Sequence, residues 1–138
     1  MKKLALTSVI VIGLFASLNA QTTDSSSTRK TPPKVLLDKI LNTPSLKNQE
    51  FKMILVTFQP GEIGAAHRHP IPTFAYVIQG EFESTFDGKV YHYKTGDTFY
   101  EEAGKLHGET KTIGNTPVKM LAIFIGDKGK PFIVPEKK

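Results

Sequence analysis

Short runs in which apolar and polar residues alternate follow one another along the chain from Phe51 onward. A side-chain period of two is typical of β-strands that have one face buried. Turn-forming residues separate the runs, and Asp87-Gly88 joins two of them as a tight hairpin turn would. Because no stretch of helical period is long enough for a crossover helix, the pattern predicts an all-β antiparallel sandwich or barrel. The expected strands are 51–58, 74–78, 81–86, 90–93, 98–100, 106–111 and 118–125.

Two of these strands are more apolar than a sheet with one solvated face requires. Residues 53–56 are apolar without interruption, and 118–125 carries apolar residues at both alternating sets of positions. One face can fill the barrel, and the other needs a cover. Two covers are open: a second copy of the chain in a homodimer, or the N-terminal segment. Within that segment, 35–41 is too short for its period to separate a strand from a one-turn helix.

The first twenty residues have the three parts of a secretory signal peptide. Two lysines follow Met1, an apolar run covers 4–15, and Ala-Ser-Leu-Asn-Ala precedes a cleavage site after Ala20. A membrane anchor is the alternative, but twelve helical residues span only about 18 Å of a hydrocarbon core about 30 Å thick. We therefore expect a signal peptide at 1–20, a Ser/Thr-rich disordered tether at 21–33 and one domain at 34–138, in the periplasm or secreted.

Composition removes several classes of function. Loss of Lys2 and Lys3 with the signal peptide lowers the formal net charge from +5 to +3, and the remaining lysines are spread along the chain. This is not the signature of a nucleic-acid-binding protein, and no membrane contact is expected after cleavage. The chain has no cysteine, which excludes disulfides, thiol nucleophiles and Cys-ligated metal sites.

Three of the four histidines lie where they can converge. His67 and His69 are two residues apart, so on a strand they share a face, and His107 follows about forty residues later. Imidazole is a common ligand for divalent transition metals. The fourth, His92, lies on a predicted hairpin strand near an exposed turn and is expected at the surface.

The spacing around these histidines resembles the two-part signature of the cupin superfamily. In the first motif, five residues lie between Gly61 and His67-x-His69, and Gly80 follows. In the second motif, five residues lie between Gly96 and Glu102-Ala103-Gly104, and two more lie between Gly104 and His107. The resemblance implies a jelly-roll barrel, commonly dimeric, in which His67, His69 and His107 bind a divalent metal.

The chain departs from the cupin pattern where the first motif carries a glutamate. Thr73 occupies that position, and Glu102 and Lys111 replace a proline and an asparagine of the second motif. Three neutral imidazoles do not offset the charge of the metal and leave positions open for water or substrate. The thiol and gentisate dioxygenases are similar in using three histidines around ferrous iron. Pirin-like cupins take a glutamate at the His-x-Glu spacing, so Glu109 is either a fourth ligand or a surface glutamate paired with a neighbouring lysine.

Other catalytic schemes lack their residues. Neither Ser45 nor Ser84 lies in a nucleophile elbow, and the adjacent Glu101 and Glu102 point to opposite faces of a strand. Phe74, Tyr76, Phe99 and Tyr100 are candidates for either the core or the walls of a pocket.

The leading hypothesis is an exported cupin that binds or oxidises a small molecule, as a dioxygenase does, with Fe(II) favoured over Mn, Zn, Ni or Cu. The alternatives are a non-catalytic small-molecule or sugar-binding module and a cupin whose site has decayed.

Overall fold

The fold consists of two β-sheets that face each other. The computed structural model describes residues 27–28 and 31–137, and no helix occurs among them. All strand pairs run antiparallel except β1 with β4. The seven-stranded sheet comprises β1 (Ser27–Thr28), β4 (Glu62–Gly64), β5 (His67–Arg68), β7 (Glu81–Phe86), β8 (Lys89–Lys94), β10 (Leu106–Thr112) and β12 (Val134–Pro135). The five-stranded sheet has the order β2 (Lys34–Leu41), β3 (Gln49–Phe58), β11 (Val118–Asp127), β6 (Thr73–Gln79) and β9 (Thr98–Glu101). The predicted all-β jelly-roll class is confirmed, and each strand predicted beyond residue 50 is present.

Alternation of side chains decides which face of each strand is buried. In β6, Thr73, Ala75 and Val77 are buried while Phe74 and Tyr76 are exposed. The same period in β11 buries every second residue from Val118 to Phe124. The core between the sheets has two clusters, the first of Phe58, Val77, Phe82, Val118 and Met120, the second of Ile54, Ile71, Ala122 and Phe124.

The hairpin predicted at Asp87-Gly88 joins β7 to β8. Both turn residues have positive φ, 47° for Asp87 and 79° for Gly88, and Phe86 pairs with Lys89 across the turn. Two consecutive positive φ values define a type I′ turn, whose twist matches that of the flanking strands. Aspartate and glycine tolerate this conformation better than other residues, which is why the dipeptide predicts the turn.

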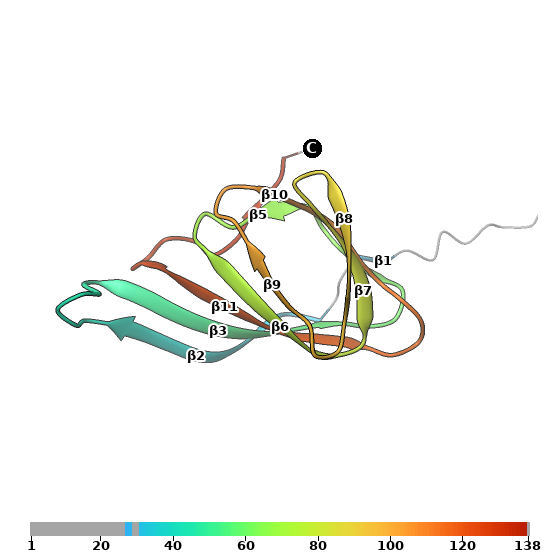
Figure 1. Cartoon of the computed structure of the whole chain (residues 1–138), viewed down its shortest axis with the longest axis horizontal. Coiled ribbons are helices and arrows are strands. Elements are labelled where there is room, and N and C mark those ends of the chain that lie inside the picture. Colours follow the sequence, from blue (N-terminus) through green and yellow to red (C-terminus); the bar gives the residue numbers. More distant parts are fainter. Residues whose placement is uncertain (1–26, 29–30, 138) are drawn as a thin grey trace, which may run out of the picture.

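The segment whose conformation the sequence left open is a strand. β2 pairs with β3 at the edge of the five-stranded sheet, and nearly all of its residues are exposed. Figure 1 shows it at one end of the molecule, away from β7 and β8. β2 thus widens the sheet by one strand and does not cover the outer face of the sheet.

The predicted signal peptide and most of the predicted tether lie outside the described residues. Ser27–Thr28 forms β1, parallel to β4, and Pro33 lines the cavity described below. Within the part of the chain that the structure describes, there is no long apolar helix that could cross a lipid bilayer.

Candidate metal centre

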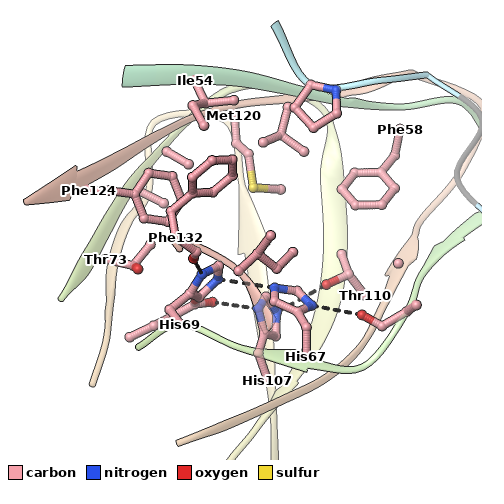
Figure 2. A pocket seen from close by; sticks show the side chains of 18 of the residues that line it. Ile54, Phe58, His67, His69, Thr73, His107, Thr110, Met120, Phe124 and Phe132 are labelled. Atoms are coloured by element: carbon pink, nitrogen blue, oxygen red, sulfur yellow. Dashed lines mark hydrogen bonds and ion pairs between the residues drawn. The ribbon is translucent and has the colours of Figure 1, made fainter. Parts of the chain in front are cut away.

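The three histidines predicted to converge lie together at the inner surface of the seven-stranded sheet. β5 pairs with β10 so that His67 lies directly opposite His107, and His69 follows β5. One nitrogen from each of the three rings lies within 4.8 Å of the other two. Figure 2 shows the three rings grouped at one end of a pocket. The sequence therefore predicted the histidine cluster itself.

Backbone carbonyl groups orient two of the imidazoles. His67 Nδ1 donates a hydrogen bond to Ala65 O at 2.8 Å, and His69 Nδ1 donates one to Phe132 O at 2.5 Å. A carbonyl oxygen only accepts, so in each neutral ring Nδ1 carries the hydrogen and Nε2 carries a lone pair. The two Nε2 atoms lie 3.1 Å apart. Two lone pairs at this distance repel each other unless a positive charge, a proton or a metal ion, lies between them.

His107 is held from its other side by hydroxyl groups. Its Nε2 lies 2.7 Å from Ser84 Oγ and 3.2 Å from Thr110 Oγ1. Its Nδ1 is buried and has no hydrogen-bond partner among the residues that the structure describes. A buried nitrogen without a partner is costly in a folded protein, so it indicates a ligand position.

A buried carboxylate that the sequence did not predict for the site completes this group. Glu101, at the end of β9, is only 4% exposed. Its Oε2 lies 3.1 Å from His69 Nε2, and its Oε1 lies 3.1 Å from His107 Nδ1, although the second contact is not aligned as a hydrogen bond. The available signal was that Phe99 and Glu101 share a strand face, so an inward Phe99 places Glu101 inward too.

Burial and mutual charge shift the protonation of the cluster towards the form that binds metal. Burial, with a further contribution from the charge of His107, lowers the pKa of His67 from 6.5 to about 4. Burial also lowers the pKa of His107. Burial alone would raise the pKa of Glu101, but the close contact with His69 and the neighbouring imidazoles of His107 and His67 outweigh burial, and that pKa is lowered. At neutral pH, His67 and His107 are therefore neutral and Glu101 is ionised, as ligands must be.

The geometry fits one divalent ion. Two nitrogens each about 2.1 Å from an ion lie about 3.0 Å apart at a right angle and about 3.4 Å apart at a tetrahedral angle. The observed separation of 3.1 Å between His67 Nε2 and His69 Nε2 falls in this interval. The unpartnered Nδ1 of His107 supplies a third donor. These residues can hold a metal ion without a change of tautomer at His67 or His69.

A cavity of about 240 Å³ extends from the histidines into the space between the sheets. In Figure 2 the imidazoles lie at one end, and Ile54 and Met120 lie towards the other. Of the four aromatic candidates only Phe99 lines the cavity, while Phe74, Tyr76 and Tyr100 are exposed on the outside of the barrel. Among the described residues, the polar lining consists of His67, His69, Thr73, Glu101, His107 and Thr110.

The comparisons with known proteins agree with this architecture. Residues 54–124, about half of the chain, match the family described as "Cupin domain". The chain belongs to the cupin family. The matched segment includes the three histidines and Glu101.

One curated relative is the pectin degradation protein KdgF of Dickeya dadantii (strain 3937). It is 34% identical over 80 residues, which are 57% of this chain and 73% of the relative.

Solved cupin structures cover more of the chain. A cupin 2 domain-containing protein from Halorhodospira halophila has a TM-score of 0.57 and 20% identity over 77% of this chain and 70% of that chain. A mutant of the Bacillus subtilis oxalate decarboxylase OxdC has a TM-score of 0.53 and 27% identity over 68% of this chain. This cupin spans only 25% of that oxalate decarboxylase chain. Another structure of the same oxalate decarboxylase, 24% identical with a TM-score of 0.57 over 79% of this chain and 29% of that chain, is described with Mn(II) centres.

The remaining candidate residues of this cupin lie apart from the imidazoles or contribute no charge. Thr73 is buried, and its hydroxyl donates to Ile71 O at 3.3 Å. Glu109 is exposed and forms an ion pair with Lys111 at 3.3 Å, which is the surface alternative that the sequence left open. His92 is exposed and pairs with Glu81 at 2.8 Å, as expected for a surface histidine.

A β-bulge explains the position of Glu109. The register of β10 against β7 shifts between His107 and Thr110, so both of these residues face inward although they are three positions apart. An extra residue in one strand reverses the alternation beyond it. Glu109, which a regular strand would place beside His107, therefore points outward.

Proposed function

We propose that this protein is an exported, metal-dependent cupin that binds and oxidises a small molecule at an ion held by His67, His69 and His107. The single observation that carries the proposal is the convergence of three imidazole nitrogens, within 4.8 Å of one another, at the polar end of an otherwise apolar cavity. When bound, the ion would act as a Lewis acid on oxygen donors of the substrate and could activate dioxygen. The residues of the chain orient the ligand nitrogens and exclude water.

Ferrous iron is the favoured metal. Imidazole ligands suit iron, zinc, copper and nickel, whereas oxygen-rich sites suit magnesium and calcium. Iron agrees with the similarity to cupin dioxygenases that use three histidines, and manganese, the metal of the oxalate decarboxylase centres, is the second candidate.

The cavity favours a compact and mostly apolar substrate with oxygen donors at one end. Phe58, Phe82, Phe99, Phe124 and Phe132 lie in its wall, and none of its described lining residues is a lysine or an arginine. A carboxylate group of a substrate would have only the metal ion as a positive partner, and burying an unpaired charge is costly. Hydroxylated aromatic compounds meet both requirements.

A non-catalytic binding module is the second candidate. Among the described lining residues the carboxylate is that of Glu101, and both of its oxygens contact histidines, so it is not free to serve as a general base. Such a module would hold the same class of ligand and leave it unchanged.

The first experiment purifies the exported protein without a histidine tag after expression of the full chain. We expect an intact mass that begins at Gln21, about one iron or manganese per chain, and oxygen uptake with a hydroxylated aromatic compound. Tight binding of that compound without oxygen uptake would favour the binding module, and a folded protein that refuses added metal would refute the site.

Two variants and a control locate the metal. His67→Ala and His107→Ala should each lose most of the metal while the β-sheet circular dichroism spectrum persists. His92→Ala, which removes an exposed histidine, should keep it. Stoichiometric metal in either of the first two variants would contradict the assignment.

A further inference from the structure

The carboxylate of Glu101 contacts the histidines on their inner sides. In each ring the nitrogen away from Glu101 is already engaged, His69 Nδ1 by Phe132 O and His107 Nε2 by Ser84 Oγ. Glu101 instead contacts His69 Nε2 and His107 Nδ1, at 3.1 Å each. A carboxylate that only orients a metal-bound histidine accepts a hydrogen bond from the nitrogen that does not bind the metal. Glu101 is on the opposite side, where the ion would lie.

We propose that Glu101 is itself the fourth protein ligand of the metal, an inference that rests on the metal site of the proposed function. The ion would lie among His67 Nε2, His69 Nε2, His107 Nδ1 and the Glu101 carboxylate. With one carboxylate the four ligands reduce the charge of a divalent ion to +1. In an octahedral site two positions remain for substrate.

Burial supports a charged partner for Glu101. Its side chain is 6% exposed, and within the described residues its ion pairs are with His69 and His107. Both of these partners are imidazoles, and neither is a lysine or an arginine with a permanent charge. Burying an ion without an oppositely charged partner is costly. A divalent cation among these atoms removes that penalty.

The strand register explains how Glu101 reaches this position. β6 pairs with β9 so that Thr73 lies directly opposite Glu101. Side chains of directly opposed residues project to the same face about 5 Å apart. Thr73 is small and turns its hydroxyl to Ile71 O, which leaves the space beside it to the longer Glu101. The carboxylate of this site is therefore supplied by β9 and not by β6.

Cobalt(II) is the probe for this assignment, because its visible absorption reports both binding and the number and type of ligands. Glu101→Gln keeps the shape of the side chain and removes its charge. We expect this variant to bind cobalt at least tenfold more weakly than the wild type and to show an altered absorption spectrum. Glu102→Gln and Glu109→Gln, which change exposed glutamates nearby, should match the wild type in both respects.

A second variant tests the role of the carboxylate independently of the side chain that carries it. Thr73→Glu in the Glu101→Gln background returns a carboxylate from the opposing strand, and we expect it to recover most of the cobalt affinity. Wild-type affinity and spectrum in a folded Glu101→Gln protein would overturn the assignment, as would failure of the double variant to recover any affinity. If the wild type itself binds no cobalt, the proposed function fails, so the two failures are distinguishable.

Discussion

At the scale of single residues, the site depends on hydrogen bonds that orient each imidazole before any ion binds. His67 and His69 use backbone carbonyls for this purpose, and His107 uses the hydroxyls of Ser84 and Thr110. Carbonyl oxygens cannot donate, so the tautomers of the first two rings are fixed by the chain itself. Metal binding then requires little reorganisation, which favours affinity.

The lowered pKa of His67 predicts how the stability of the metal-free protein depends on pH. The unfolded chain takes up a proton at His67 near the ordinary pKa of 6.5, whereas the folded protein takes it up only near 4. Between these values the unfolded state binds more protons, so the free energy of unfolding falls as the pH falls. The lowered pKa of His107 acts in the same direction below 6.5.

Urea unfolding with EDTA at pH 7, 6 and 5 measures this dependence. We expect a loss of about 1 to 3 kcal/mol between pH 7 and pH 5, since one pKa unit corresponds to about 1.4 kcal/mol. His67→Gln should flatten the profile, and His92→Gln should leave its slope unchanged. Equal or greater stability at pH 5 in the wild type would contradict the pKa shift.

At the scale of strands, the sequence predicts what depends on local period and spacing. Alternation and turn residues located seven of the strands, and the His-x-His pair located two of the three histidines that converge. Glu101 was not predicted because its position opposite Thr73 depends on the pairing of β6 with β9, and strand register is a nonlocal property. Glu109 points outward because of a bulge, and a single extra residue in β10 leaves no clear signal in an alternating pattern.

Gly108 permits the close approach of β10 to β7 at this bulge. A Cβ atom on Gly108 would lie 2.9 Å from Thr85 Cβ and 3.2 Å from Thr85 Cγ2. Gly108→Ala should therefore push the strands apart beside His107, lower the free energy of unfolding by about 1 to 3 kcal/mol and weaken cobalt binding. Urea unfolding and cobalt titration measure the two effects.

A double-mutant cycle isolates the contact with Thr85. In a Thr85→Gly background the facing side-chain atoms are absent, so most of the additional cost of Gly108→Ala should disappear. The same cost in both backgrounds would mean that the clash is not its cause.

At the scale of the whole molecule, the five-stranded sheet has an apolar outer face as well as an apolar inner one. Phe74, Tyr76, Ile78 and Tyr100 are each about half exposed there, and the rings of Phe74 and Tyr100 lie 5.1 Å apart. Leu121 and Ile123 of β11 extend this outer-face patch, because they pair with Tyr76 and Phe74. A large exposed apolar patch on a soluble protein usually marks an interface. β2 lies at the edge of the sheet and leaves the patch uncovered. We therefore propose that a second copy of the chain covers the patch, sheet against sheet.

The oligomeric state of residues 21–138 tests this homodimer. We expect light scattering coupled to size-exclusion chromatography to give twice the mass of the chain, because a symmetric interface removes the apolar patch of each copy from water. Tyr76→Glu places a charge in the centre of the patch and should yield monomers with unchanged circular dichroism. Val90→Glu is the matched control, because Val90 is 66% exposed on β8 of the other sheet. A wild type that stays monomeric at high micromolar concentration would contradict the homodimer, and dissociation by Val90→Glu but not by Tyr76→Glu would move the interface to the seven-stranded sheet.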